Sequence, residues 1–250
     1  MKVGTQIYIA GKSDVGLQRA NNEDALAILD GGNVCVVADG MGGHLGGEVA
    51  SSMVTDAIRV EFLNSAGTIT DPKEIARRLV SVIEEANAEI HARGNRDAKL
   101  RNMGTTVVAA VFQGSSIIYA SVGDSRIYRL RNGKLEQLTE DHSWVGELRK
   151  RNLISNEDAR NHPLRNIITR ALGMEKDVDV DCTIAQTQPG DLYLFCSDGL
   201  TDLVNEQEMQ ETLAGCGGDI DAAIDNLIEA ANDYGGIDNI TVGIARVDAA

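Results

Sequence analysis

The sequence predicts an α+β protein in which two packed sheets carry helices on their outer sides. Apolar strand-like runs and amphipathic helical stretches stand in separate blocks, and no regular strand–helix alternation joins them. Of the 250 residues 43% are hydrophobic and only 4% aromatic, which predicts a sizeable and mostly aliphatic core. The number of segments fits one domain that spans residues 1–250.

Periodicity and turn signals place the elements in order. Apolar residues at helical spacing predict a helix over 48–64, and Asp71-Pro72-x-Glu74 is a typical start for a second helix that runs to about residue 93. Further helices are expected at 144 to about 162, 205–214 and 220–233. Strands are expected at 34–38, 105–112, 116–122, 126–130, 135–138, 178–184, 192–196 and 240–247. Asn132-Gly133 is a hairpin signal between two of these strands.

Charge and composition exclude several classes of function. The chain has 23 basic and 38 acidic residues, a net charge of −15, which argues against a nucleic-acid-binding surface. No apolar run approaches the roughly 18 residues of a membrane span, and residues 1–12 lack the pattern of an export signal. The four cysteines contain no Cys-x-x-Cys pair, so neither a disulfide framework nor a thiolate zinc site is expected. We therefore expect a cytoplasmic protein without membrane or nucleic-acid partners.

The most informative pattern is the repeated placement of aspartate at the end of an apolar strand. The residues concerned are Asp39, Asp124, Asp198 and Asp238. Carboxylates gathered in this way repel one another unless a hard cation lies among them, and oxygen-only ligands suit Mg²⁺ or Mn²⁺ better than zinc. The alternative is that each Asp-Gly is an ordinary turn dipeptide. Spacing alone leaves both readings open.

A series of short motifs surrounds these aspartates. In chain order they are Arg19-x-x-Asn22-Glu23-Asp24, Asp39-Gly40-Met41-Gly42-Gly43-His44, Gly47-Glu48, Met103-Gly104-Thr105-Thr106, Gly123-Asp124-Ser125-Arg126, Thr139-x-Asp141-His142-Ser143, Ile168-Thr169-Arg170-Ala171-Leu172-Gly173, Ser197-Asp198-Gly199-Leu200 and Asp238-Asn239-Ile240-Thr241. Each motif is weak by itself. Together, and in this order, they resemble the metal-dependent protein phosphatases of the 2C type, in their bacterial branch. The resemblance extends from about Gly11 to Val247.

The resemblance implies a four-layer fold, a β-sandwich of two antiparallel sheets flanked by helices on both sides. It also implies two Mn²⁺ or Mg²⁺ ions and a third, weaker one. Asp39 would bridge two ions, and the Gly40 carbonyl would complete one of them. The remaining assignments that the resemblance implies are Asp198 and Asp238 as ligands, Asp124 at the third ion, Asp24 and Glu23 in or behind the second ion's shell, and Arg19 as the phosphate-binding arginine.

The implied reaction is hydrolysis of phosphoserine and phosphothreonine monoesters by a metal-activated water. Two metals lower the pKa of a bridging water and hold the phosphoryl oxygens, so no protein nucleophile is needed. Eukaryotic relatives carry histidine directly after the Asp-Gly pair, whereas this chain has Met41, which puts the identity of the general acid in doubt. His44 is a candidate for that role, the alternative being that it orders the glycine loop. His142 is expected to tie down its loop through a hydrogen bond.

The stretch from about 143 to 167 corresponds to a variable flap in the family. Basic residues are in excess in and just after it: Arg149, Lys150, Arg151, Arg160, Arg165 and Arg170. Its basic face would receive anionic phosphopeptides, or it is simply a solvated helix; both stay open. The expected partners are phosphoprotein substrates and a cognate Ser/Thr kinase, and the protein is expected to be a monomer. The alternative functions are a catalytically silent binding module of the same fold and a two-metal phosphodiesterase.

Overall fold

Two antiparallel sheets form the centre of the molecule in the computed structural model, which describes residues 5–29, 33–42, 45–64, 68–155, 158–159 and 162–250. The first sheet has the strand order β1-β11-β10-β7-β8. Its strands are β1 (Thr5–Asp14), β11 (Ile240–Ala249), β10 (Leu192–Cys196), β7 (Arg126–Arg131) and β8 (Lys134–Gln137). β1 and β11 pair along their whole lengths, so they join the two ends of the described chain in one ladder.

The second sheet has the order β2-β3-β5-β6-β9, with the short β4 paired to β3. Its strands are β2 (Asp24–Ile28), β3 (Val34–Met41), β4 (Gly104–Thr105), β5 (Val107–Gln113), β6 (Ser116–Val122) and β9 (Asp181–Gln186). Alternate side chains of β3 enter different cores: Val36 and Ala38 pack under helices, whereas Cys35 and Val37 face the first sheet. This two-residue period is what a strand buried on both faces requires.

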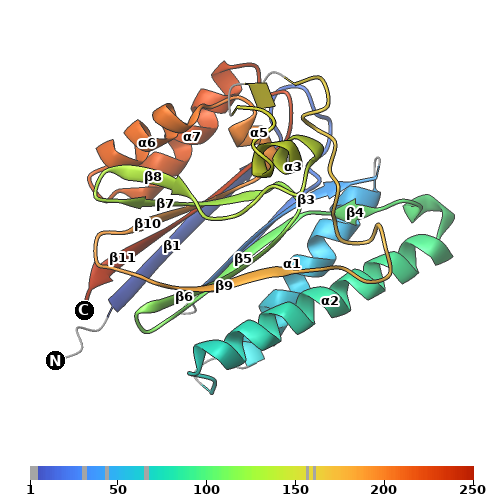
Figure 1. Ribbon diagram of the computed structural model, residues 1–250, viewed down its shortest axis with the longest axis horizontal. Helices are drawn as coiled ribbons and strands as arrows, with labels where there is room; N and C mark the ends of the chain where they lie inside the picture. Colours follow the sequence, from blue (N-terminus) through green and yellow to red (C-terminus); the bar gives the residue numbers. More distant parts are fainter. Residues whose placement is uncertain (1–4, 30–32, 43–44, 65–67, 156–157, 160–161) are drawn as a thin grey trace.

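Helices cover the outer face of each sheet, α1 and α2 on one side and α6 and α7 on the other (Figure 1). The helices are α1 (Gly46–Asn64), α2 (Pro72–Arg96), the 3₁₀ turn η1 (Ala98–Leu100), α3 (Trp144–Lys150), α5 (Asp198–Thr201), α6 (Glu206–Gly215) and α7 (Ile220–Asp233). Three apolar clusters fill the spaces between the four layers, and Phe112 meets Tyr193 edge to face at 5.4 Å in the central one. The four-layer fold expected from the sequence is confirmed.

Most elements lie close to where the sequence places them, and four differences have physical reasons. The expected strand 105–112 is two strands, β4 and β5, because Thr106 leaves the ladder to hydrogen-bond Asp39. The expected helix from 144 to about 162 ends at Lys150, where Asn152 takes a positive φ of 55°. The alternating strand starts at Asp181 and not at Val178. β1 and β2 were not predicted, since β1 alternates with exposed polar residues and β2 has only five residues.

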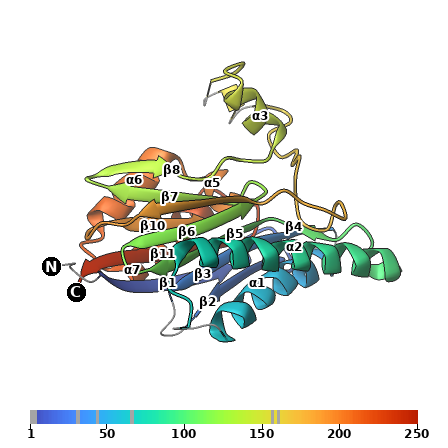
Figure 2. The same ribbon diagram turned by 60° about the horizontal axis from the view of Figure 1, so that its bottom comes forward.

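The segment that follows β8 leaves the body of the sandwich. Figure 2 shows α3 projecting away from both sheets, connected to them by two loop segments. Ser143 caps α3 by accepting a hydrogen bond from the Gly146 backbone N–H at 3.2 Å. The segment that leads back to the sandwich pairs with the segment that leads to α3 through one antiparallel bridge, between Ser143 and Ile168. This projecting segment corresponds to the region expected to be a flap.

Candidate active site

Carboxylates from both sheets collect at one end of the sandwich. Asp24 is the first residue of β2 and lies opposite Asp39 in the register of β2 and β3. Asp198 is the first residue of α5 and is separated from the end of β10 by Ser197 alone. Asp124 follows β6, and Asp238 precedes β11 by two residues. The fold thus brings together the strand-end aspartates that the sequence pattern singled out, although they come from different sheets.

The backbone at Asp39 is fixed on both of its polar groups. Its N–H donates to Thr106 Oγ1 at 3.0 Å, and its carbonyl accepts from the Thr106 N–H and the Thr105 hydroxyl, each at 2.9 Å. Both threonines are fully buried. A backbone held by buried hydrogen bonds fixes the point from which the side chain extends before any ligand binds. Asp39 is therefore a rigid member of the group.

The carboxyl groups of Asp39 and Asp198 lie close enough to affect each other's pKa. Two carboxylates this close repel each other, which favours protonation of one of them. Burial, and then the charges of Asp198 and Asp24, hold the pKa of Asp39 well above its ordinary value. Burial is also the first cause that raises the pKa of Asp198 to about 6, with the charges of Asp202 and Asp238 adding to it. The raised pKa values favour protonated carboxyl groups in this cluster, and a bound cation would displace those protons.

Two oxygens in this cluster are buried and have no hydrogen-bond partner within the described part of the chain, Asp124 Oδ1 and Asp198 Oδ1. A partnerless buried carboxylate oxygen is costly, and a hard divalent cation is the partner that such oxygens accept best. No group of three or more His, Cys, Asp or Glu among the described residues stands in an arrangement that could hold a metal ion as it is. The donor chemistry fits Mg²⁺ or Mn²⁺, and a bound ion would replace any protons on these carboxyl groups.

Asp24 is held by two hydroxyl groups from the other sheet. Its Oδ2 accepts from Ser197 Oγ at 2.8 Å and from Thr241 Oγ1 at 2.6 Å. Burial raises the pKa of Asp24 to about 7, the two hydroxyls oppose the rise, and the charges of Asp198 and Asp238 add to it. Because both hydroxyls bind the same oxygen, Asp24 is better placed to orient its neighbours than to coordinate an ion directly.

Asp124 lies in the turn between β6 and β7 and is buried. Burial, followed by the charges of Asp198 and Asp141, raises the pKa of Asp124 to about 8, while Arg126 lowers it. Arg126 grips Asp141 with two hydrogen bonds, Nε to Oδ1 at 2.9 Å and Nη2 to Oδ2 at 2.7 Å. This fork carries a fixed positive charge beside the carboxyl cluster.

Arg19 and Asp238 form an ion pair, with Arg19 Nη2 at 2.6 Å from Asp238 Oδ2. Half of the Arg19 side chain is exposed, so its guanidinium stands at the mouth of the cluster. Asn239 ties the loops around this pair together: its Oδ1 accepts from the Glu23 N–H at 2.8 Å, and its Nδ2 donates to the Val15 and Asn21 carbonyls at 2.9 Å. A guanidinium has five donors, so a pair with one carboxylate leaves it able to bind phosphate oxygens.

Gly40 and Glu23 lie where β3 meets the start of α1. A Cβ on Gly40 would lie 2.2 Å from the Gly47 carbonyl oxygen and 2.5 Å from the Glu23 carbonyl oxygen, so no other residue fits there. The Glu23 carbonyl accepts from the Gly40 N–H at 3.2 Å and from Ser51 Oγ at 2.6 Å. A Cβ on Gly47 would lie 2.5 Å from Glu23 Oε2. These glycines allow the strand and the helix to approach closely beside the carboxyl cluster.

Met41 ends β3 and is opposite Gly104 in the ladder with β4. A thioether has no proton to give, so Met41 cannot protonate a leaving group. His44, the candidate general acid, lies outside the described residues, as does Gly43. The role of His44 therefore stays a prediction.

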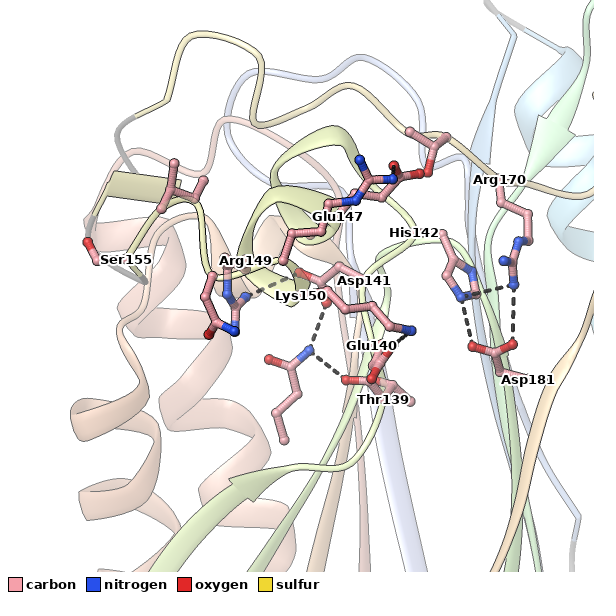
Figure 3. A pocket seen from close by; sticks show the side chains of 16 residues that line it. Thr139, Glu140, Asp141, His142, Glu147, Arg149, Lys150, Ser155, Arg170 and Asp181 are labelled. Carbon is pink, nitrogen blue, oxygen red and sulfur yellow. Dashed lines mark hydrogen bonds and ion pairs between the residues drawn. The ribbon is translucent and has the colours of Figure 1, made fainter.

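A pocket of about 930 Å³ lies between α3 and the sandwich (Figure 3). At its inner end the Gly123 N–H donates to His142 Nδ1 at 3.0 Å, so the neutral ring carries its proton on Nε2, 3.0 Å from Asp181 Oδ2. The His142 backbone also bonds Gly123 and Thr169. His142 thus ties the flap to the turn that carries Asp124, as the sequence predicts.

The basic side chains around this pocket are paired with acids. The pairs are Lys150–Glu140 at 2.5 Å, Arg170–Asp181 at 3.2 Å, Arg151–Glu147 at 3.8 Å and Arg149–Asp141 at 3.9 Å. Figure 3 shows the first, second and fourth of these around the cavity. A second pocket, of about 710 Å³, has Asp124 and Asp198 in its wall together with flap residues such as Arg165. The flap therefore borders the carboxyl cluster directly.

Several residues that build the site had no role in the sequence reasoning. Ser197 and Thr241 orient Asp24, Asn239 joins the loops, and Arg126, held by Asp141, places a positive charge near Asp124. The signal for the first three was their place next to Asp198 and Asp238 within the quoted motifs. Thr105 and Thr106, interpreted as the structural start of a strand, are structural but bond Asp39 directly.

Comparison with known proteins identifies the family. The model of the family described as protein phosphatase 2C matches residues 17–224. A serine/threonine phosphatase, stp, of Listeria monocytogenes serotype 4b is 43% identical over 240 residues, which are 95% of this chain and 94% of that protein.

Solved structures agree over nearly the whole chain. Serine/threonine phosphatase Stp1 from Staphylococcus aureus superimposes with a TM-score of 0.90 at 36% identity, covering 98% of this chain and 97% of that one. The catalytic domain of the serine threonine protein phosphatase PstP, in complex with two manganese ions, gives a TM-score of 0.85 at 36% identity and covers 98% of this chain and 99% of that one. The sequence motifs, the four-layer fold and these matches together show that the chain belongs to the protein phosphatase 2C family.

Proposed function

We propose that this chain removes phosphate from phosphoserine and phosphothreonine of proteins by attack of a water on phosphorus. As a member of the protein phosphatase 2C family it is a metal-dependent phosphoprotein phosphatase. The observation that carries the assignment of the site is the buried carboxyl cluster, in which Asp124 Oδ1 and Asp198 Oδ1 lack a hydrogen-bond partner among the described residues. A bound cation would give both oxygens a partner and offset the repulsion between the carboxylates.

Five groups would hold the metal ions in this proposal: the Asp39, Asp124, Asp198 and Asp238 carboxylates and the Gly40 carbonyl. Asp124 would serve a third, weaker ion together with Asp198, and Asp24 and Glu23 would stand behind the others. Bound Mn²⁺ or Mg²⁺ supplies Lewis acidity to the phosphoryl oxygens and lowers the pKa of the attacking water. Asp39, held by Thr105 and Thr106, gives the cluster its fixed centre. The two manganese ions in the PstP structure support a site for two ions.

Arg19 would bind the phosphate. Its guanidinium is half exposed at the mouth of the cluster and keeps its orientation through Asp238. A planar fork can bind two phosphate oxygens at once, which a lysine cannot. The same pair places the phosphate next to a proposed metal ligand.

The wider setting follows from the family. The substrates would be phosphoproteins, and a Ser/Thr kinase would act in the opposite direction. We propose that residues 1–250 form one catalytic domain, with a flap at about 143–167, and that the protein works as a monomer in the cytoplasm. No helix in the described part of the chain has the length and apolar character needed to cross a membrane.

The test is hydrolysis of p-nitrophenyl phosphate with Mn²⁺, with Mg²⁺ and with EDTA, by the wild type, Asp198→Asn and Asp202→Asn. Asp202 serves as a control because it is a carboxylate in the next turn of the chain, with its side chain 26% exposed, paired with Arg165 at 3.6 Å and not a proposed ligand. We expect turnover that EDTA abolishes. Asp198→Asn should lower it by at least about a hundredfold, since even outer-shell changes cost 10–100-fold in metal affinity.

Asp202→Asn should keep most of the activity. The proposal fails if the folded wild type has no turnover with either metal, which would favour a silent binding module, or if Asp198→Asn and Asp202→Asn lose activity equally. Isothermal titration with Mn²⁺ separates loss of metal binding from loss of the fold.

A further inference from the structure

Two large aliphatic side chains stand in water beside the Arg19–Asp238 pair. Leu17 is 68% exposed and Ile237 is 39% exposed. Neither belongs to any of the three apolar clusters that hold the layers together. This apolar surface therefore stays exposed to water in the folded chain and takes no part in the described core. We call these two side chains the ledge.

The backbone places the ledge directly against the proposed phosphate-binding group. The Leu17 and Gln18 N–H groups donate to the Gly236 carbonyl at 2.8 and 3.1 Å. Two residues further along each loop, Arg19 meets Asp238 at 2.6 Å. Two residues span at most about 7 Å, so the ledge begins within one or two side-chain lengths of the guanidinium.

The ledge is held in place. Gly236 has a φ of +48°, and a Cβ at this position would lie 2.9 Å from Leu17 Cγ, so the absence of a side chain lets Leu17 lie across the second loop. Asn239 Nδ2 fixes the first loop through the Val15 and Asn21 carbonyls. An apolar surface that is already ordered costs little entropy when a ligand covers it.

Two molecules could cover the ledge: a second copy of this chain, or the substrate polypeptide that carries the phosphate. A stable dimer interface buries about 1,200–2,000 Å² in total, far more than two aliphatic side chains supply. The substrate, in contrast, is brought to this place by its phosphate on Arg19. An extended peptide advances about 3.3 Å per residue, so a residue one or two positions from the phosphorylated one reaches the ledge.

We propose that the ledge is a specificity subsite that binds an apolar side chain within two residues of the phosphorylated residue of the substrate. The proposal rests on the proposed function, because Arg19 must bind the phosphate for the peptide to lie here. Covering aliphatic surface is favourable in proportion to the apolar area removed from water. The enzyme should therefore distinguish phosphopeptides by the residues that flank the phosphate.

The experiment compares kcat/KM for a set of phosphothreonine peptides with alanine flanks, in which leucine is placed in turn two and one residues before and one and two residues after the phosphothreonine. The enzymes are the wild type, Leu17→Ser, Ile237→Ser and the control Leu63→Ser. Leu63 is 56% exposed, a fraction similar to that of Leu17. It is the last but one residue of the 19-residue helix α1, which extends about 28 Å from its start at the site end, at 1.5 Å per residue. p-Nitrophenyl phosphate, which has no flanking residues, measures the chemistry alone.

We expect leucine at one or more of these positions to raise kcat/KM of the wild type by roughly tenfold, mainly through KM, as a pocket contact with one aliphatic group does. Leu17→Ser and Ile237→Ser should reduce this preference and leave p-nitrophenyl phosphate turnover unchanged, and Leu63→Ser should change neither. The proposal is overturned if the wild type shows no preference, if the ledge variants keep it, or if they lose p-nitrophenyl phosphate turnover as well. It is also overturned if sedimentation shows a wild-type dimer that Leu17→Ser dissociates. Failure of the proposed function is distinct, since the wild type would then not hydrolyse p-nitrophenyl phosphate.

Discussion

Asp24 shows how uncharged side chains act on the pKa of a buried carboxyl group. Its Oδ2 depends on two hydroxyls, Ser197 and Thr241, that are themselves fully buried. Ser197 Oγ in turn accepts from the Thr241 N–H at 3.0 Å. Hydrogen bonds of this kind favour the ionised carboxylate against burial, which raises the pKa of Asp24 to about 7. Two uncharged side chains thus act on the protonation of Asp24.

Thr241→Val tests this arrangement, because it keeps the shape of the side chain and removes the hydroxyl. We expect the Mn²⁺ affinity to fall about 10–100-fold, as for other outer-shell changes. The free energy of unfolding should fall by about 1–3 kcal/mol, since a buried carboxyl group loses a donor. Isothermal titration and urea unfolding measure the two effects.

Thr187→Val is the matched control. Thr187 is also buried, but its Oγ1 has no hydrogen-bond partner in the described part of the chain, so the change should be neutral or slightly stabilising. An unchanged Mn²⁺ affinity in Thr241→Val would contradict the role of the hydroxyl.

At the scale of elements, the basic side chains of the flap form ion pairs with acidic side chains of the flap and of the segment that leads into it. Lys150 and Arg151 at the end of α3 are highly exposed and are paired with Glu140 and Glu147. Arg149 leans toward Asp141, which Arg126 also holds. The basic excess in the sequence of this segment is therefore matched locally by acids from the flap and its root. Of the two interpretations that the sequence left open, the pairing favours a solvated, ion-paired helix.

The double variant Lys150→Glu/Arg151→Glu tests the basic face. Exposed ion pairs are worth about 0–1 kcal/mol and are screened within about 10 Å at 0.1 M salt. We therefore expect the KM for a phosphopeptide to change less than about twofold at that salt concentration. Steady-state kinetics beside circular dichroism measure the effect and the fold. A KM that rises tenfold in a folded variant would show instead that the basic face receives the substrate.

The elements also show where sequence patterns succeed. α2 follows its capping residues and apolar stripe, with Asp71 accepting from the Lys73 N–H at 3.1 Å as the motif predicts. The sequence does not predict β1 because none of its ten residues is fully buried, and its partner β11 lies at the other end of the chain. Local pattern finds elements that carry their own signal, and pairing over long distances decides the rest.

At the scale of the whole molecule, the carboxyl cluster couples stability to pH. The pKa values of Asp198, Asp24 and Asp124 are raised to about 6, 7 and 8, chiefly by burial. An ordinary aspartate in the unfolded chain has a pKa of about 3.9, so between pH 4 and 8 the folded metal-free protein binds more protons than the unfolded one. The stability that these groups contribute is present below about pH 4 and is lost as pH rises through 6 to 8.

In EDTA we therefore expect the free energy of unfolding to fall between pH 5.5 and pH 8, as measured by urea unfolding. Binding of Mn²⁺ displaces the protons, so its affinity should rise over the same range. Asp124→Asn should flatten the pH dependence in EDTA, whereas the exposed Asp233→Asn should not. A metal-free protein that becomes more stable toward pH 8 would contradict the protonated cluster.

The sequence by itself determined the class of this protein. Strand-end aspartates, glycine pairs and capped helices are local patterns, and their order along the chain carries a resemblance to a known family, which implies the four-layer fold and the reaction. The tertiary structure decided which side chains meet. Asp24 and Ser197 are 173 residues apart in the chain, and their side-chain oxygens are 2.8 Å apart in the fold. Leu17 and Ile237 form one ledge only because the Leu17 loop is hydrogen-bonded to Gly236. Such contacts depend on the pairing of β1, β10 and β11, and no local pattern carries information on it.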